Sequence, residues 1–418
     1  MNFKELTIKE WQQFQDVEIK FHDRLTILTG ANGSGKTTIL GNILARHFGW
    51  EVQSCSTPKK DKKTGVISFL TRLFNGENKN DSSKIGYILY DNDQKASLRV
   101  PDQNSAQYQL QILGQQGVQC FFIPSHRSVF RYHPVNNIPF GKKDKRSAFQ
   151  EVSNATKDRY LGGNNQPSSF LMKNTLIGWA YQGYRLVDDS GKEINARDSE
   201  QVKFYEGFKN VLRKILPKTL GFEDFEIRER EIVFICNKGK DEFVLEQASG
   251  GVSALIDIAW QIYMYSTVEK TEFTVIIDEI ENHLHPTMQR RILPDLLDSF
   301  PEARFVVSTH SPLVVGSVQD SNVFVFKYND NGKIVSQELD LINQAKTATE
   351  ILTEVLGVSF TMPIWAEDKL MGIVEKYSSK RMTKGEFSNM RRELDEIGLG
   401  RLMPEAVYKL MKIDNDKD

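Results

Sequence analysis

A phosphate-binding loop pattern constrains this chain more than any other feature of its sequence. Residues 30–37 read Gly-Ala-Asn-Gly-Ser-Gly-Lys-Thr and fit G-x-x-x-x-G-K-[ST] at every fixed position. Residues 24–29 predict a buried strand and residues 37–44 predict the start of a helix, which is the context that the motif requires. There, backbone N–H groups converge on phosphates, Lys36 reaches the outer phosphates and the Thr37 hydroxyl binds Mg²⁺. We therefore predict a nucleotide site.

Two further predicted strands end in polar residues. The apolar run 273–277 is typical of a buried parallel strand and is followed by Asp278 and Glu279, and residues 304–307 lead to His310. Ligands bind at the carboxyl edge of such sheets, so these residues are expected near Lys36. Asp278 is suited to hold magnesium through water, Glu279 to orient or deprotonate the attacking water, and His310 to contact the γ-phosphate.

A second anion-binding device is predicted at residues 249–251, where Ser-Gly-Gly precedes the amphipathic run 253–265. Such a turn presents free N–H groups and a positive helix end without side-chain obstruction. By itself the same pattern also describes a flexible helix cap.

Composition describes a globular chain of 418 residues with 39% hydrophobic and 26% charged residues. Its net charge of −1 gives no evidence for nucleic acid binding, although this net charge is compatible with a local basic face.

The three cysteines lack C-x-x-C spacing, which favours a reducing compartment and argues against a zinc site. The His283/His285 pair also has no further metal ligand nearby in the sequence. Without an apolar signal core or a membrane-spanning run, the expected location is cytoplasmic, with no membrane partner.

Several residues keep two interpretations. Trp11 or Phe14, in the turn of a predicted N-terminal hairpin, could stack on adenine or pack at the sheet edge. Arg127 follows a predicted strand at 119–124, where it is a phosphate contact or a surface ion pair. The basic run 141–146 either touches nucleic acid or is a solvated loop.

These motifs, in this order, resemble the ABC-type ATPase head domain over roughly residues 1–50 and 225–330. Within that superfamily, the loop at 30–37 and the run Asp-Glu-Ile-Glu-Asn-His-Leu-His-Pro at 278–286 look like the RecF, SMC and OLD-type group. More narrowly, the chain is similar to stand-alone ATPases of bacterial anti-phage defence systems, such as the Septu, PARIS and retron-associated subunits. Residues 347–358 also resemble that group.

The resemblance implies a sandwich in which two heads enclose two ATP molecules, each held between the loop of one subunit and the Ser-Gly-Gly turn of the other. Ala248 and Val252 depart from the Leu and Gln of transporter ATPases, and Gln119 is the candidate for the usual glutamine loop. The resemblance implies that Lys36, Glu279 and His310 are catalytic and that Thr37 and Asp278 bind the metal. It also implies that the nucleotide is contacted by Gly30, Ala31, Asn32, Gly33, Ser34, Gly35, Lys36, Thr37, Thr38, Ser249, Gly250 and Gly251.

The expected fold is α/β: an ABC-type P-loop ATPase head with an antiparallel N-terminal subdomain, a mostly helical insertion and a helical C-terminal tail. Residues 1–140 and 221–338 are expected to form the two parts of the head, 141–220 the insertion and 339–418 the tail. No nuclease domain is visible after His310.

The leading functional hypothesis is an ATP-hydrolysing, Mg²⁺-dependent switch, dimeric or larger. It would sense or handle nucleic acid, or hold and release an effector protein encoded nearby. The alternatives are the energising subunit of a membrane transporter and a scaffold that binds ATP but scarcely hydrolyses it.

Overall fold

The computed structural model describes residues 1–60, 67–70, 84–101, 106–137, 141–163, 166–184, 186–187, 190, 193–195, 197–266, 271–339, 351, 364–378 and 383–415. They belong to two compact units, Met1–Ile351 and Leu352–Asp418. Across these ranges, no helix has both the length and the apolar character needed to cross a membrane.

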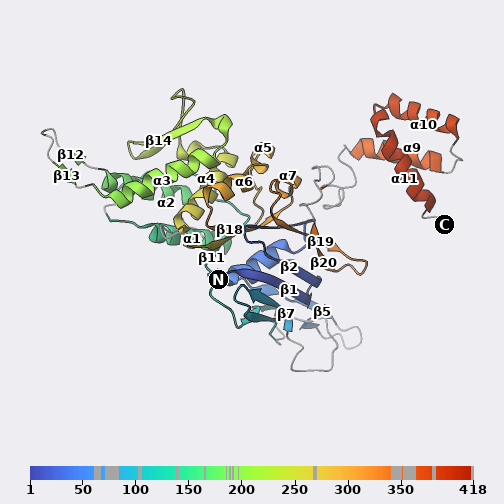
Figure 1. The fold of residues 1–418 in the computed structure, drawn as a ribbon, viewed down its shortest axis with the longest axis horizontal. Helices are drawn as coiled ribbons and strands as arrows, with labels where there is room; N and C mark the ends of the chain where they lie inside the picture. The colour runs from blue at the N-terminus through green and yellow to red at the C-terminus, as the bar shows by residue number, and fades with distance from the viewer. Residues whose placement is uncertain are drawn as a thin grey trace. The chain divides into compact units, whose positions relative to one another are not determined.

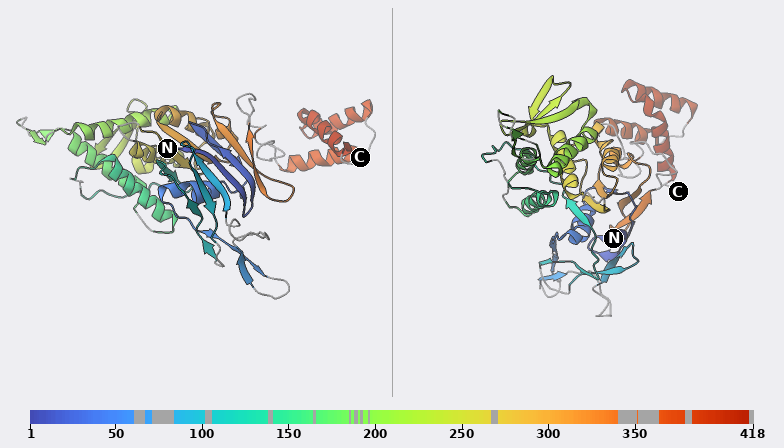
Figure 2. Two further views of the ribbon diagram at one scale, coloured as in Figure 1. Left: turned by 60° about the horizontal axis from the view of Figure 1, so that its bottom comes forward. Right: turned by 60° about the vertical axis from the view of Figure 1, so that its left-hand side comes forward.

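A mixed sheet of 11 strands forms the centre of the first unit (Figures 1 and 2). Its first five strands and the pair β20–β19 are antiparallel neighbours, whereas β19, β3, β18, β17 and β11 run parallel. The spatial order is β10 (Gln111–Leu113), β8 (Lys95–Arg99), β7 (Lys84–Tyr90), β1 (Phe3–Trp11), β2 (Phe14–Lys20), β20 (Ile334–Leu339), β19 (Asn322–Tyr328), β3 (Leu25–Gly30), β18 (Ala303–Thr309), β17 (Phe273–Ile277) and β11 (Cys120–Ile123).

This topology confirms the expected α/β head with an antiparallel N-terminal part. Every residue of β3 and β17 is buried, which explains why both segments are apolar runs without alternation. Since β3, β18, β17 and β11 are parallel, their carboxyl ends lie at one edge of the sheet.

A layer of helices packs beside the parallel strands (Figure 1). It contains α1 (Lys145–Tyr160), α2 (Ser168–Gly183), α3 (Ser199–Ile215) and α4 (Gly250–Tyr265). Trp179 of α2 and Trp260 of α4 are fully buried with ring centroids 5.7 Å apart, and Phe208 of α3 lies 4.8 Å from Trp260. These aromatic contacts join the helices of the predicted insertion to the helix that follows the Ser-Gly-Gly turn.

Smaller elements complete the first unit. A three-stranded sheet lies against α3, and helices connect the parallel strands. These elements are β4 (Ser54–Cys55), β5 (Thr57–Lys60), β6 (Ile67–Leu70), β9 (Gln107–Tyr108), β12 (Leu186–Val187), β13 (Glu193–Asn195), β14 (Phe222–Arg228), β15 (Glu231–Cys236), β16 (Asp241–Val244), α5 (Pro286–Gln289), α6 (Ile292–Ser299) and α7 (Pro312–Val315).

The helix after the phosphate loop differs in type from the prediction. Instead of a regular α-helix, the chain winds as a π-helix, η1 (Thr38–Ile43), and then as a 3₁₀-helix, η2 (Leu44–Phe48). Apolar periodicity predicts a helical segment, but it does not determine whether its hydrogen bonds span three, four or five residues.

Trp11 and Phe14 are packing residues. Both are buried, with ring centroids 5.9 Å apart, and the Trp11 indole Nε1–H donates to the Tyr108 hydroxyl at 2.9 Å. Because both side chains are buried against other residues of the protein, packing is favoured over adenine stacking.

The second unit is helical, as expected for the tail. It contains α9 (Ile364–Ser378), α10 (Lys384–Glu396) and α11 (Met403–Asn415). These helices share a small core of their own, made of Leu370, Val374, Tyr377, Met390, Leu394, Ala406 and Leu410. Residues 347–358, which carry part of the family resemblance, lie outside the described residues except for Ile351.

Candidate nucleotide site

The phosphate loop leaves the carboxyl end of β3 with its glycines in conformations that other residues rarely adopt. Gly30 has φ 143° and Gly35 has φ 80°. A Cβ at Gly35 would overlap the Phe14 ring, and a Cβ at Gly30 would overlap the Phe326 carbonyl oxygen. Residues of β2 and β19 thus lie close against the loop and restrict its backbone at these two glycines.

The Lys36 side chain is buried within this loop. Its ammonium donates hydrogen bonds to the Gly30 and Ala31 carbonyl oxygens, each at 3.0 Å, and to the Ser34 hydroxyl at 3.2 Å. Burial lowers the pKa of Lys36 to about 8, against the opposing attraction of Asp278 and other nearby carboxylates. A bound phosphate would compensate this buried cation, since charged groups out of water are costly without an opposite charge.

We expect Lys36→Met to stabilise the nucleotide-free protein while abolishing ATP binding. The fall in the Lys36 pKa from 10.5 to about 8 corresponds to a cost of roughly 3 kcal/mol for the buried cation near pH 7. Because the folded-state pKa lies below the unfolded one, that cost is full below pH 8 and disappears as the pH rises towards 10.5. Thermal unfolding measured from pH 7 to 10.5 should therefore show that Lys36→Met is more stable than wild type at pH 7 and that this difference shrinks as the pH rises. Exposed Lys238→Met is the control, and parallel profiles for wild type and Lys36→Met would contradict the expectation.

The candidate metal position joins the loop to the acidic strand. The Thr37 hydroxyl donates to Asp278 Oδ2 at 2.9 Å, and the Ser308 hydroxyl, on β18, donates to Asp278 Oδ1 at 2.5 Å. Burial raises the Asp278 pKa, so a nearby cation would favour its charged form. One hydroxyl beside one carboxylate fits Mg²⁺, which takes few protein oxygens and completes its shell with water and phosphate.

The candidate base, Glu279, is the next residue in the chain after Asp278 and has φ 45°. Its carboxylate accepts a hydrogen bond from the Asn282 amide at 2.7 Å. Its backbone N–H donates to the Ser308 hydroxyl at 2.8 Å. His310 Nε2 lies 3.9 Å from Glu279 Oε1. The structure therefore brings Glu279 and His310 together at the same edge as Thr37 and Asp278.

His310 is held by a residue to which the sequence assigned no specific role. Glu281 Oε1 accepts the His310 backbone N–H at 2.5 Å. Burial, with the nearby Lys36 cation, lowers the pKa of His310, so its imidazole is neutral near pH 7. Ser308 and Asn282 were also missed, because a lone serine or asparagine carries no chemical pattern until its partner is known.

The Ser-Gly-Gly turn opens α4, with Ser249 at the N-cap position. Gly250 is exposed, and a Cβ there would meet no atom within 4 Å, whereas Gly251 lies against the His283 carbonyl and the Met288 sulfur. The first turn of α4 therefore has an open approach at Gly250.

Arg127 occupies neither of its two predicted roles. The side chain is buried, and its Nη2 donates to the Asp278 and Glu279 carbonyl oxygens at 2.8 and 3.1 Å, while Nη1 donates to the Pro124 carbonyl. Burial lowers its pKa to about 10, so it remains charged near pH 7. This guanidinium joins the end of β11 to the backbone of the two acids.

We expect Arg127→Met to destabilise the fold by roughly 3 kcal/mol or more, because each buried carbonyl left without a donor costs about 1–3 kcal/mol. ATP hydrolysis should fall with it, because the backbone at Glu279 loses its fixed position. Urea unfolding and phosphate release would measure the two effects. Arg127→Lys, which keeps the charge but offers fewer fixed donors, should be intermediate. Wild-type stability in the methionine variant would show that these bonds contribute little.

Gln119, the candidate for the glutamine loop, is not at this site. It immediately precedes β11, and the parallel register of Cys120 with Thr274 places it at the edge opposite Asp278.

The basic run 141–146 is only partly loop, because α1 begins at Lys145. Within the run, the Lys142 ammonium pairs with the Asp198 carboxylate at 3.0 Å.

Comparisons with known proteins indicate the family of this chain. Residues 25–316 match the family model described as "AAA domain, putative AbiEii toxin, Type IV TA system". The Retron Vc95 probable ATPase of Vibrio cholerae serotype O1 biovar El Tor is 22% identical over 91% of this chain and 83% of its own length. The Septu protein PtuA of Bacillus mycoides (strain KBAB4) is 28% identical over 55% of this chain, and the match spans 33% of that relative.

Among solved structures, an SMC head bound to the C-winged helix domain of ScpA is 15% identical, with a TM-score of 0.46, over 81% of this chain and 98% of that chain. The named relatives confirm the resemblance to retron-associated ATPases and to a Septu protein. Because the family match covers most of the chain and includes the loop, both acids and His310, this chain belongs to the AAA-domain family described as putative AbiEii toxin, Type IV TA system.

Proposed function

We propose that this protein is a Mg²⁺-dependent ATPase whose nucleotide holds two copies together, acting as the regulatory subunit of an anti-phage defence system. The observation that carries the proposal is the 2.9 Å hydrogen bond from Thr37 to Asp278, with Glu279 as the next residue. It unites a phosphate loop, a metal-binding pair and a candidate base at one sheet edge.

In this proposal each residue has a defined task. Lys36 neutralises the outer phosphates, and Thr37 with Asp278 would hold Mg²⁺, which stabilises the charge that develops on the phosphates. Glu279, oriented by Asn282, positions the attacking water and takes its proton. Neutral His310 donates a hydrogen bond to the γ-phosphate.

The shared site is supported by the turn at 249–251. The first N–H groups of α4 lie at a helix end, which favours anions, and the open approach at Gly250 would leave room for a phosphate brought by a second copy. Hydrolysis would remove that phosphate and release the pair. This change in assembly would then alter the binding of an effector protein encoded nearby or of a nucleic acid.

The solution mass of Glu279→Gln, with and without ATP and Mg²⁺, tests this proposal. ATP should shift the variant to a species of twice the subunit mass or larger, because it binds nucleotide but cannot cleave it. Wild type should show the shift only transiently, and Lys36→Ala, which is expected to lose ATP binding, should not show it. A mass that is independent of ATP in Glu279→Gln, with ATP binding verified, would reject the nucleotide-held pair.

A further inference from the structure

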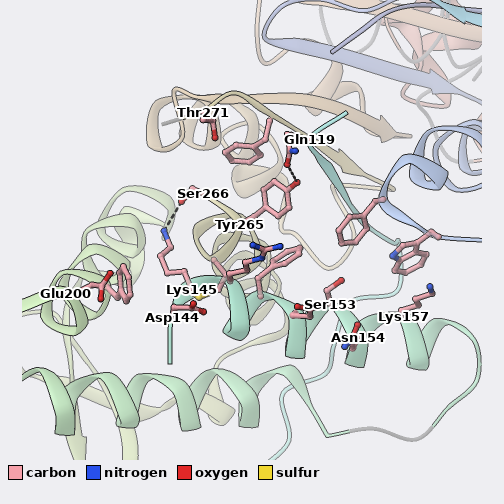
Figure 3. Close-up of a pocket in the computed structure, with 18 residues that line it drawn as sticks. Gln119, Asp144, Lys145, Ser153, Asn154, Lys157, Glu200, Tyr265, Ser266 and Thr271 are labelled. Atoms are coloured by element: carbon pink, nitrogen blue, oxygen red, sulfur yellow. Dashed lines mark hydrogen bonds between the residues drawn. The ribbon is translucent and has the colours of Figure 1, made fainter. Parts of the chain in front are cut away.

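A second cavity lies at the sheet edge opposite the phosphate loop (Figure 3). Its volume is about 910 Å³, within the range of small-molecule sites. Gln119 and Phe273 line it from the amino ends of β11 and β17, whose carboxyl ends lead to Arg127 and Asp278. The remaining walls come mainly from α1, from the last turn of α4, from the first turns of α3 and from the end of η2. This cavity is therefore separate from the candidate ATP site.

The lining of the cavity has more cationic than anionic side chains, although the Lys157 ammonium also donates to the Gly49 carbonyl oxygen at 2.9 Å. Lys145, Arg146 and Lys157 line it from α1. Its two acidic lining residues are already engaged: Asp144 accepts the Ser147 backbone N–H at 2.7 Å as the helix cap, and Glu200 pairs with Lys142 at 2.9 Å. An anion would thus meet cations whose neighbouring carboxylates have other partners.

Lys145 is the most deeply placed of these cations. Its ammonium donates to the Ser266 hydroxyl at 3.0 Å and lies 3.9 Å from the centre of the Tyr263 ring, so both of these partners are uncharged. Burial lowers the Lys145 pKa to about 8, and the more distant Glu302 only partly opposes this. A partly buried ammonium whose partners are neutral is unfavourable, and a bound anion would offset that cost.

The other wall groups suit a planar, polar ring. Tyr265, half-buried, belongs to an aromatic cluster with Phe149 at 4.9 Å and Phe273 at 5.1 Å between ring centroids. Figure 3 shows Lys145, Ser153 and Lys157 along α1 facing Tyr265 and Gln119 across the cavity. Aromatic rings stack on nucleobases, and amides and hydroxyls pair with base edges.

We propose that this cavity binds one nucleotide, with its phosphate on the cations of α1 and its base against the Tyr265 cluster. The nucleotide is either free or part of a single-stranded nucleic acid, since both offer the same base and phosphate. This assignment does not depend on ATP hydrolysis at the phosphate loop.

Calorimetric titration with AMP and with a short 5′-phosphorylated single-stranded DNA tests the proposal. All proteins would carry Lys36→Ala, so that any remaining binding at the phosphate loop is common to them. Arg146→Glu combined with Lys157→Gln should weaken binding about tenfold or more, because charge-assisted contacts to phosphate are lost. Ser153→Trp, which fills the cavity without changing charge, should weaken it similarly. Exposed Lys238→Glu, on the turn between β15 and β16, is the control for a charge reversal away from the cavity and should stay within about twofold.

The two probes separate the sources of the ligand. AMP binding that both cavity variants remove identifies a free-nucleotide site, and binding of the oligonucleotide alone, removed by the same variants, identifies a nucleic acid strand. The proposal is overturned if neither probe binds, if the cavity variants bind normally, or if Lys238→Glu loses binding as well. Circular dichroism of each variant would verify folding, and the charge and filling variants do not share a substituted residue.

Discussion

Glu279→Gln is expected to lower the rate of ATP hydrolysis by a factor of about 10²–10⁴ while leaving ATP affinity nearly unchanged. The amide keeps the shape of the side chain and its contact with Asn282, but it cannot accept a proton from water. The Thr37–Asp278 pair and Lys36 are untouched, so nucleotide and Mg²⁺ should still bind. Phosphate release and equilibrium ATP binding, measured on the same preparations, would separate the two effects.

Glu272→Gln is the matched control, because Glu272 precedes the same strand at its opposite end and pairs with Arg304 at 2.8 Å. It should hydrolyse ATP at the wild-type rate. If Glu279→Gln also hydrolysed normally, Glu279 would not be the base. If wild type itself scarcely hydrolysed ATP, the alternative of an ATP-stabilised scaffold would be favoured.

Mixing Lys36→Ala with Ser249→Arg, each inactive alone, is expected to restore ATP hydrolysis. If each site takes its phosphate loop from one copy and its Ser-Gly-Gly turn from the other, a mixed pair contains one site with both parts intact. Random pairing makes half of the pairs mixed, with one of two sites intact, so activity should reach about a quarter of wild type if the sites act independently. Titrating one variant into the other and measuring phosphate release would show the recovery.

A second mixture controls for this result. Lys36→Ala mixed with Glu279→Gln should remain inactive, because Lys36 and Glu279 belong to the same chain at every site. Normal hydrolysis by Ser249→Arg alone would reject the shared site. So would a mixture with Lys36→Ala that stays inactive although native mass spectrometry shows mixed pairs.

Much of the nucleotide site could be predicted from sequence. The motif at 30–37 depends on short-range requirements, namely glycines with positive φ and a lysine and threonine at set spacing, so it is recognisable without a fold. Asp278 and Glu279 were found because a fully buried strand that ends in two acids is costly unless they have a task. The structure places them beside Thr37, within hydrogen-bond reach for Asp278.

The supporting contacts were not predictable in the same way. Ser308 and Asn282 orient the two acids, but neither residue type signals this task by itself. Arg127 was singled out at a strand end, yet its actual acceptors are backbone carbonyls. Backbone carbonyls are present at every residue, so no sequence pattern distinguishes the ones that a buried guanidinium will reach.

By itself, then, the sequence determined the phosphate loop, the acidic strand end and the α/β class, because each rests on local backbone geometry or on the periodicity of burial. Only the tertiary structure decided what Arg127 binds, at which edge of the sheet Gln119 lies and which cavity the cations of α1 line. Those features depend on the parallel register of β11 with β17 and on the packing of α1 against α4. Such contacts join residues that are far apart in the chain, and their partners are chosen by the fold as a whole.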